Sequence, residues 1–222
     1  IKFLINCGAN IKVRKRVITV RGVNELNLYN HEVIPDRVEA GSYILAAMAS
    51  KGKIILNNIN IDDLTFPLEV YQSMGLKIKQ VSTSSYEFSC TNLKSIKNIK
   101  TKEFPGYPTD LQAQLIASLL KVGQKSNITE NIFENRFIHI PELRRFGAQL
   151  DIVGNTVVIN KTNDLFGAEV MATDIRASFS LIIAAIISKG TTTINRIYHL
   201  DRGYEDFDLK LKKCGVNIKR KK

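Results

Sequence analysis

Phe146-Gly147-Ala148-Gln149-Leu150 closes an apolar segment, and the same pattern of residue types occurs at three other places in this chain of 222 residues. The other copies are Cys7-Gly8-Ala9-Asn10-Ile11, Met74-Gly75-Leu76-Lys77-Ile78 and Cys214-Gly215-Val216-Asn217-Ile218. Their glycines are 67, 72 and 68 residues apart. Regular spacing of this kind indicates that the chain is built from a repeated structural unit.

A second repeated pattern, an apolar run that stops at a glycine, lies out of phase with the first. It occurs at 46–52, 117–123 and 184–190 and therefore has three copies where the first pattern has four. The chain thus opens in the last third of a unit, and we expect residue 1 to be a cut within a larger protein. Residues 1–34 are expected to be the last strands of a preceding domain with the crossover, and residues 35–222 one threefold-repeat domain.

Each unit is expected to begin with a buried helix. Pro35-Asp36, Pro108-Thr109-Asp110 and Thr173-Asp174 are typical helix openings, and apolar runs follow them. The run 179–187 is apolar on all sides, which is typical of a helix without a solvent face. The glycine that stops each run is expected to take a left-handed conformation at the helix end.

The rest of a unit reads as a short strand, an amphipathic helix and a hairpin. Strands are expected at 53–56, 127–129 and 191–194, and hairpins at 77–79 with 87–89 and at 149–153 with 156–159, the latter turning at Gly154-Asn155. The order is βαβαββ. Solenoid units usually span about 20 to 50 residues, which is shorter than this repeat. We therefore predict an α/β (α+β) protein in which three βαβαββ repeats surround shared buried helices, with the sheets outside.

Composition favours a soluble cytoplasmic protein. An apolar content of 44% suffices for a core, and no run approaches the roughly 18 apolar residues of a membrane span. Three cysteines without a CxxC pair favour a reducing compartment. The net charge of +11 suggests nucleic acid, but the basic residues alternate with apolar ones and form no nucleic-acid motif. Solvated faces are favoured, and attraction of small anions is the alternative.

Four strings contain polar residues at helix starts and strand ends, at related places in the repeat. They are 35–39, 107–114, 133–137, and 172–178 taken together with 198–204. Loops that share one edge of a scaffold are where sites are usually built. The sequence within and around these strings closely resembles the UDP-N-acetylglucosamine enolpyruvyltransferase (1-carboxyvinyltransferase) family. The most specific parts of this resemblance are YPTDLQAQ, FENRF, VMATDIRAS and RIYHLDRGYE, and it runs through the whole chain.

The resemblance implies a transferase fold of two inside-out α/β barrel domains that close over UDP-N-acetylglucosamine and phosphoenolpyruvate. It implies that the enolpyruvyl group moves to the sugar 3-hydroxyl and that phosphate is released, as the first committed step of peptidoglycan synthesis, with consequences for cell wall biogenesis, cell shape and division. This chain would be the C-terminal half, with the missing N-terminal half as its partner.

The resemblance also assigns roles to residues of this sequence. Asp110 matches the family's proposed base at the 3-hydroxyl, although an aspartate after Pro-Thr is also a typical helix cap. Arg136, Arg176 and Arg202 match the arginines around phosphoenolpyruvate, and guanidinium groups suit carboxylate and phosphate because they form two parallel hydrogen bonds. Surface or ion-paired arginines are the alternative. Ile132 matches a backbone contact to the nucleotide-sugar.

Other polar residues near these strings have two possible roles. Phe133 adjoins Ile132 and is either a site residue or a packing residue. Asp36, Arg37 and Asp174 either support the site or cap helices and form ion pairs. No phosphate-binding glycine loop occurs, so phosphate binding would rest on the arginines.

The family's catalytic acid is a cysteine of the other domain, and none of the three cysteines here replaces it. Cys7 and Cys214 occupy the repeat position of Met74 and Phe146 and are expected to pack, and Cys90 lacks a cationic partner. The chain alone is therefore expected to be inactive.

No cofactor is expected, neither a metal nor an organic group. The three histidines, His31, His139 and His199, show no metal-ligand spacing and are expected to be structural. Two rival functions remain: enolpyruvyl transfer to shikimate 3-phosphate, and a non-catalytic polyanion-binding module. Asp110 argues against the second, because a phosphate binder needs no base.

Overall fold

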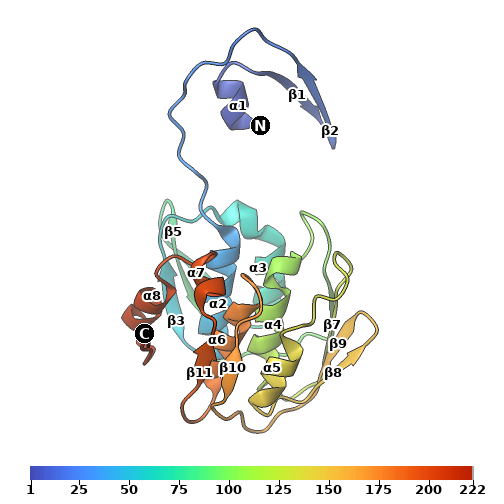
Figure 1. Cartoon of the computed structure of the whole chain (residues 1–222), viewed down its shortest axis with the longest axis vertical. Coiled ribbons are helices and arrows are strands. Elements are labelled where there is room, and N and C mark those ends of the chain that lie inside the picture. Colours follow the sequence, from blue (N-terminus) through green and yellow to red (C-terminus); the bar gives the residue numbers. More distant parts are fainter. Residues whose placement is uncertain (222) are drawn as a thin grey trace. The chain divides into compact units, whose positions relative to one another are not determined.

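The computed structural model describes residues 1–221, which form two compact units that divide after Pro35 (Figure 1). The first unit contains α1 (Lys2–Asn6) and the antiparallel strands β1 (Asn10–Arg14) and β2 (Val17–Arg21). Among residues 1–35 only Cys7 is buried, while apolar side chains such as Val17 and Val20 are exposed. This unit has almost no core of its own.

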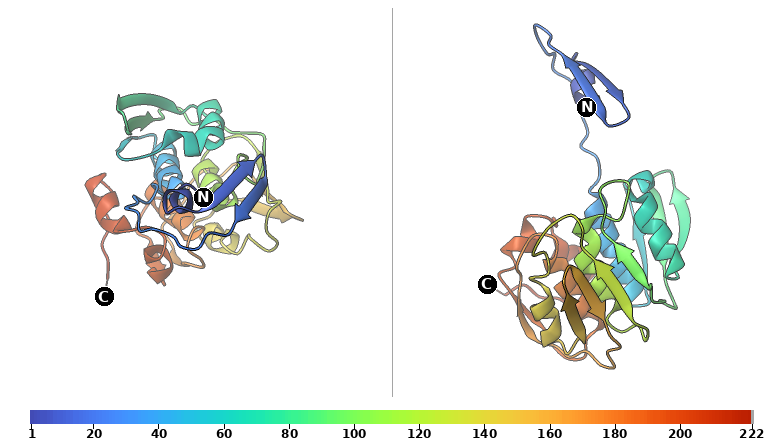
Figure 2. Two further views of the ribbon diagram at one scale, coloured as in Figure 1. Left: turned by 90° about the horizontal axis from the view of Figure 1, so that it is seen from above. Right: turned by 90° about the vertical axis from the view of Figure 1, so that its right-hand side faces the viewer.

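Three helices that pack against one another form the centre of the second unit (Figures 1 and 2). They are α2 (Arg37–Ala49), α4 (Gln112–Leu119) and α6 (Ser178–Ile187). Every residue of α4 is buried, as expected for a helix surrounded by protein. Asp36 caps α2, because its Oδ1 accepts hydrogen bonds from the amides of Val38 and Glu39, which confirms that predicted helix start.

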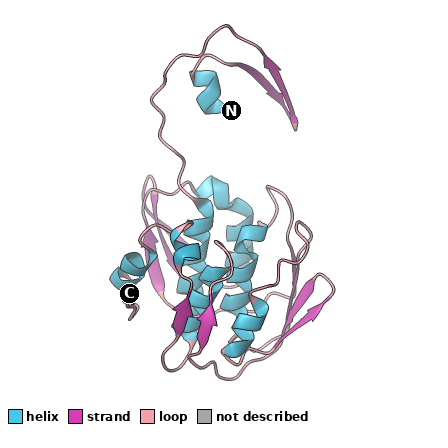
Figure 3. Cartoon of the chain, in the orientation of Figure 1, coloured by secondary structure: helices cyan, strands magenta, loops and turns pink. Residues whose placement is uncertain are grey.

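Three sheets lie outside these helices (Figure 3). The first has the order β3 (Lys53–Leu56), β5 (Ser85–Ser89), β4 (Lys77–Ser82), and the second the order β6 (Asn98–Lys100), β7 (Ser126–Thr129), β9 (Thr156–Ile159), β8 (Leu150–Val153). The third pairs β10 (Glu169–Met171) with β11 (Thr193–Asn195). The remaining helices are α3 (Thr65–Ser73), α5 (Ile140–Arg145), α7 (Tyr198–Asp201) and α8 (Phe207–Lys213), with 3₁₀ turns at Ile61–Leu64 and Thr109–Leu111.

The mixed α/β content is as predicted, but the repeats differ in completeness. The second repeat has the full order β6, α4, β7, α5, β8, β9. The first begins at α2 without a preceding strand, and the third ends at α8, with no hairpin among residues 214–221. Both predicted hairpins are present, as β4 with β5 and as β8 with β9.

The glycines of the first pattern share one backbone conformation. Gly8, Gly75, Gly147 and Gly215 have φ angles of 100°, 107°, 91° and 90°, in the region that favours glycine because it has no Cβ. The prediction for the second pattern is confirmed at Gly190, where φ is 89°, and is wrong at Gly52 and Gly123. After α2 the left-handed residue is instead Lys51, with φ of 56°, so the chain turns one residue earlier.

Gly75→Ala is expected to destabilise the protein more than Gly147→Ala. Both glycines have positive φ, which costs an alanine about 1 to 2 kcal/mol. A Cβ at Gly75 would also lie 2.5 Å from the carbonyl oxygen of Asn92, whereas at Gly147 its nearest neighbour would be 3.6 Å away. Urea unfolding of both variants measures the difference, and equal losses of unfolding free energy would contradict it.

Candidate active site

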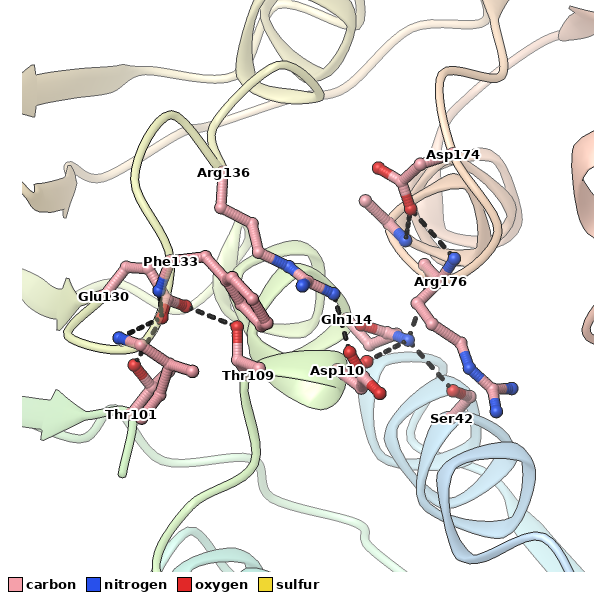
Figure 4. Close-up of polar contacts among 12 residues, drawn as sticks. Ser42, Thr101, Thr109, Asp110, Gln114, Glu130, Phe133, Arg136, Asp174 and Arg176 are labelled. Carbon is pink, nitrogen blue, oxygen red and sulfur yellow. Dashed lines mark hydrogen bonds and ion pairs between the residues drawn. The ribbon is translucent and has the colours of Figure 1, made fainter. Parts of the chain in front are cut away.

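Asp110 lies in the 3₁₀ turn that leads into α4. Neither this turn nor α4 has a side-chain cap, so the capping role considered from the sequence is wrong for Asp110. Its Oδ1 instead accepts a hydrogen bond from Nη2 of Arg136 at 2.6 Å (Figure 4). The side chain of Asp110 is 41% exposed, so its carboxylate remains accessible to a ligand.

Arg136 belongs to a loop that follows β7 and carries two more predicted site residues. Its guanidinium lies over the ring of Phe133, 5.0 Å from the ring centroid. Asn135 has a positive φ of 54°, which turns the chain directly before Arg136, and asparagine tolerates this conformation better than most residues. Ile132, Phe133 and Arg136 line a cavity of about 760 Å³. Ile132 and Phe133 are exposed, so packing does not account for either side chain.

Arg176, two residues before the start of α6, is held in place by three contacts. Its Nη2 donates to Oδ2 of Asp36 at 2.8 Å, its Nη1 donates to the carbonyl oxygen of Gly203 at 3.1 Å, and the guanidinium lies over the ring of Tyr204. Burial lowers the pKa of Arg176, but the hydrogen bond to Asp36 and the nearby carboxylates outweigh burial and leave the pKa above its ordinary value. Arg176 therefore stays charged.

The predicted supporting residues Asp36, Asp174 and Arg37 differ in their roles. Asp36 caps α2 and also pairs with Arg176. Asp174 accepts hydrogen bonds from the amides of Arg176 and Ala177, which fixes the backbone from which Arg176 extends. Arg37 lies over the ring of Phe104 and donates a hydrogen bond to the carbonyl oxygen of Asp63.

Arg202 follows α7 and is exposed, and within residues 1–221 its side chain has no hydrogen bond or ion pair. Together with Arg176 it lines another cavity, of about 780 Å³. The cavity also contains many carboxylates, and Arg220 binds two of them, those of Asp201 and Asp208. Arg202 is thus an arginine of this cavity that is available to an anion.

Gln114 of α4 joins the segments that carry Asp110 and Arg176, although sequence reasoning did not single it out. Its Nε2 lies within 3.1 Å of the carbonyl oxygens of Asp110 and Arg176 and of the hydroxyls of Ser42 and Tyr204. Gln114 is fully buried, and a buried amide needs hydrogen-bond partners. A glutamine within an otherwise apolar helix run is the sequence signal that could have pointed to such a network. The helices of all three repeats meet at this residue (Figure 4).

Four of the predicted site residues line two cavities. Arg176 and Arg202 line the first cavity, and Ile132 and Arg136 line the second. Asp110 lines neither cavity but contacts Arg136 through its side chain, and its backbone is joined to that of Arg176 through Gln114. An accessible carboxylate with arginines on both sides can bind an anionic substrate and accept a proton beside it.

The cysteines differ from one another in burial. Cys7 is buried as predicted, but Cys214 is exposed, so the prediction that it packs is wrong. Cys214 comes directly after α8, where no hairpin follows in the described residues to cover it. Cys90 is buried, and this burial raises the pKa of its thiol.

Neither a metal cluster nor a membrane helix is present in the part of the chain that the structure describes. Residues 1–221 contain no group of three or more histidine, cysteine, aspartate or glutamate side chains placed to hold a metal ion. In the same residues no helix has both the length and the apolar character needed to cross a membrane.

His139, directly before α5, is expected to make stability depend on pH. It is fully buried, and neither ring nitrogen has a hydrogen-bond partner in the described chain. Desolvation, together with the charge of Arg136, lowers the pKa of His139 from 6.5 to about 3. The unfolded chain therefore binds a proton below pH 6.5 that the folded chain does not bind, and this contribution to stability is lost as pH falls from 6.5 towards 3.

The loss should reach at most about 1.4 kcal/mol per pH unit for one such group. His139→Leu removes the titrating ring and should give a shallower decline of the unfolding free energy in this range. Parallel urea titrations of both proteins between neutral and acidic pH measure the slopes. Identical slopes would show that His139 does not contribute.

Known proteins resemble this chain over nearly its whole length. The sequence profile of EPSP synthase (3-phosphoshikimate 1-carboxyvinyltransferase) matches residues 1–211. The UDP-N-acetylglucosamine 1-carboxyvinyltransferase of Pelagibacter ubique is 47% identical over 99% of this chain and 53% of its own length. The enzyme of the same name from Lawsonia intracellularis is 41% identical, with the same coverage. The chain thus spans about half the length of these curated relatives.

Solved structures share the fold. The enolpyruvyl transferase NikO from Streptomyces tendae superposes with a TM-score of 0.83 at 24% identity, over 97% of this chain and 52% of that one. EPSP synthase from Acinetobacter baumannii gives a TM-score of 0.77 at 16% identity, over 100% of this chain and 55% of that one. Because the family profile covers nearly the whole chain, this protein belongs to the EPSP synthase (3-phosphoshikimate 1-carboxyvinyltransferase) family of carboxyvinyltransferases.

Proposed function

We propose that this chain provides one side of an active site that transfers the enolpyruvyl group of phosphoenolpyruvate to the 3-hydroxyl of UDP-N-acetylglucosamine. The observation that supports this most directly is the pair formed by Asp110 and Arg136, in which an accessible carboxylate has no capping role. The curated relatives named above carry this activity in their names. In a cell the reaction would serve peptidoglycan synthesis, in the cytoplasm.

The reaction forms a bond between the sugar oxygen and C2 of phosphoenolpyruvate while the hydroxyl proton goes to a base and C3 gains a proton from an acid. C3 then loses a proton as phosphate leaves C2, which restores the double bond. Asp110 is the proposed base that accepts the hydroxyl proton. In the structure its Oδ1 is hydrogen-bonded to Arg136. An anionic group that binds Arg136 would compete with Asp110 for the guanidinium, so substrate binding would free the carboxylate for the hydroxyl.

The arginines would hold the anionic substrate. Arg202 has no protein partner within residues 1–221, so a carboxylate or phosphate can bind it without breaking an ion pair. Arg176 already forms an ion pair with Asp36, so only part of its guanidinium group would be free to bind the substrate. Ile132 would contact the nucleotide-sugar through its backbone, from the edge of the second cavity.

The remaining parts of the site would come from a second domain. The exposed apolar side chains of residues 1–35 support the proposal that this unit completes the end of another domain, since an exposed apolar surface usually marks a contact. The acid that protonates C3 would be a cysteine of that domain, because Cys7 and Cys90 are buried here and the exposed Cys214 lines neither cavity. No metal or organic cofactor enters the proposed reaction.

The test uses the whole protein that contains this chain, with phosphate release as the measurement. Release that requires both phosphoenolpyruvate and UDP-N-acetylglucosamine is the expected result. Shikimate 3-phosphate in place of the nucleotide-sugar is the control acceptor, and faster release with it would favour the sister reaction. Binding of both substrates without phosphate release would favour the non-catalytic module and overturn the proposal. The 222-residue chain alone should release no phosphate until the missing half is added.

A further inference from the structure

Glu130 is a buried carboxylate directly after β7, with 3% of its surface exposed. Its Oε1 accepts hydrogen bonds from the hydroxyl of Thr101 at 2.8 Å and from the amides of Ile132 and Phe133 at 2.8 and 3.1 Å. Its Oε2 accepts a hydrogen bond from the hydroxyl of Thr109 at 2.7 Å. Both carboxylate oxygens therefore accept hydrogen bonds, three at Oε1 and one at Oε2. Within residues 1–221 no lysine or arginine pairs with it, and its charge is held by these donors alone.

These four bonds join the two segments that carry the Asp110 and Arg136 side chains (Figure 4). Thr109 directly precedes Asp110, and the two amides begin the loop that ends in Arg136. The two segments meet again where Arg136 donates to Asp110 at 2.6 Å. The two segments are therefore joined at two points, by the hydrogen bonds of Glu130 and by the ion pair of Asp110 with Arg136. Together these contacts form a closed ring.

The bond to Thr109 distinguishes this arrangement from ordinary loop capping. A loop needs an acceptor for its free amides, and a neutral oxygen is sufficient for that. Asn155, for comparison, supports the same loop with its amide, which donates to the carbonyl oxygen of Glu130 at 3.0 Å and to Oδ1 of Asn131 at 3.1 Å. Only the second carboxylate oxygen reaches Thr109, and a buried charge is costly unless several donors satisfy it.

We propose that Glu130 is a positioning residue that sets the spacing between Asp110 and the loop 131–136. This rests on the proposed function, in which the loop contacts the nucleotide-sugar at Ile132 and Asp110 accepts the proton of the 3-hydroxyl. A nucleotide-sugar bound at Ile132 would then present its hydroxyl at a fixed distance from the carboxylate. Displacement by about 1 Å at a reacting group can cost roughly a hundredfold in rate.

The first test is kinetic and uses Glu130→Gln in the whole protein. The glutamine keeps one oxygen for the two amides, but its amide nitrogen donates where Oε2 accepted, so the charged acceptor of the Thr109 hydroxyl is lost. We expect kcat to fall roughly ten- to a hundredfold, while KM for phosphoenolpyruvate changes by a smaller factor, because only Arg136 of the three arginines belongs to this ring and Arg176 and Arg202 lie outside it. An unchanged kcat in folded Glu130→Gln would overturn the proposal.

The matched control is Glu142→Gln on α5. Glu142 also uses a carboxylate oxygen to bind a backbone amide, that of Met171, at 2.8 Å, but it contacts neither Asp110 nor Arg136. The Glu142→Gln variant should keep the kcat and KM of the unaltered protein even if its melting temperature falls. If Glu130→Gln resembles this control, with lost stability and unchanged kinetics, Glu130 is structural only.

Thr109 provides a second pair of variants in case Glu130→Gln does not fold. Thr109→Val keeps the shape and removes the bond to Oε2, whereas Thr109→Ser keeps the hydroxyl. We expect Thr109→Val to lower kcat by about three- to tenfold, and Thr109→Ser to restore it. Equal kcat for the valine and serine variants would contradict the proposal.

Hydrogen exchange at the amides of Ile132 and Phe133 provides a readout that does not depend on activity. Because a neutral acceptor binds an amide more weakly than a carboxylate does, Glu130→Gln should speed this exchange several-fold, and Glu142→Gln should not. If Glu130→Gln speeds the exchange as expected but the unaltered protein transfers no enolpyruvyl group, the proposed function fails and the ordering of the loop by Glu130 stands. If the exchange is unchanged, the proposal about Glu130 fails whatever the activity is.

Discussion

Asp110→Asn in the whole protein is expected to lower kcat by roughly 10²- to 10⁴-fold, the usual contribution of a general acid or base. Asparagine keeps an oxygen that can accept the hydrogen bond of Arg136, but it cannot take up a proton. Stability should change little, because the Asp110 side chain does not cap a helix and is 41% exposed. Steady-state phosphate release and thermal unfolding measure the two quantities.

Asp164→Asn is the matched control for this experiment. Asp164 is also an accessible aspartate in an ion pair, with Nζ of Lys189 at 2.8 Å, but it lines neither cavity. Its loss should leave kcat unchanged. If Asp110→Asn retains turnover near that of this control, Asp110 binds substrate or pairs with Arg136 and is not the base.

Arg202→Ala is expected to lower kcat/KM for phosphoenolpyruvate about ten- to a hundredfold, which corresponds to about 1.5 to 3 kcal/mol for one charge-assisted contact. Arg202→Lys should recover little, because an ammonium group cannot form the two parallel hydrogen bonds of a guanidinium. The melting temperature should stay the same, since Arg202 is exposed and has no partner in the described chain.

The structure makes Arg202 a clearer test than Arg176. Arg176→Ala would also break contacts to Asp36 and Gly203, so lost activity and lost stability would be mixed. Arg196→Ala is a suitable control, because Arg196 is also exposed and its side chain donates to Tyr198 of α7 and to Met171 of β10. Unchanged kinetics together with a lower melting temperature for Arg202→Ala would show that Arg202 has a scaffold role.

The sequence predicted those features that depend on neighbouring residues. The apolar run 179–187 indicated a buried helix, and α6 covers it as Ser178–Ile187. Gly154-Asn155 indicated a tight turn, and it joins β8 to β9. Asp36 was a typical helix start and caps α2. Helix burial, turns and caps are encoded within a few residues, so pattern and propensity suffice to predict them.

The sequence was wrong or silent where distant segments decide the outcome. Cys214 had the same repeat position as the buried Met74, yet it is exposed because no hairpin follows α8 among the described residues. Glu130 carried no motif, and its importance comes from Thr101 and Thr109, which reach it from 29 and 21 residues away.

By itself the sequence determined the repeat, the helix and strand types, the family resemblance and the residues named as candidates for the site. Only the tertiary structure decided that Asp110 pairs with Arg136 and that Gln114 joins the segments of Asp110 and Arg176, which are 66 positions apart in the chain. It also decided that Arg202 has no partner in the described chain. The physical reason is that hydrogen bonds and ion pairs depend on atoms within about 3 Å of one another, and chain folding, not local propensity, brings these atoms together.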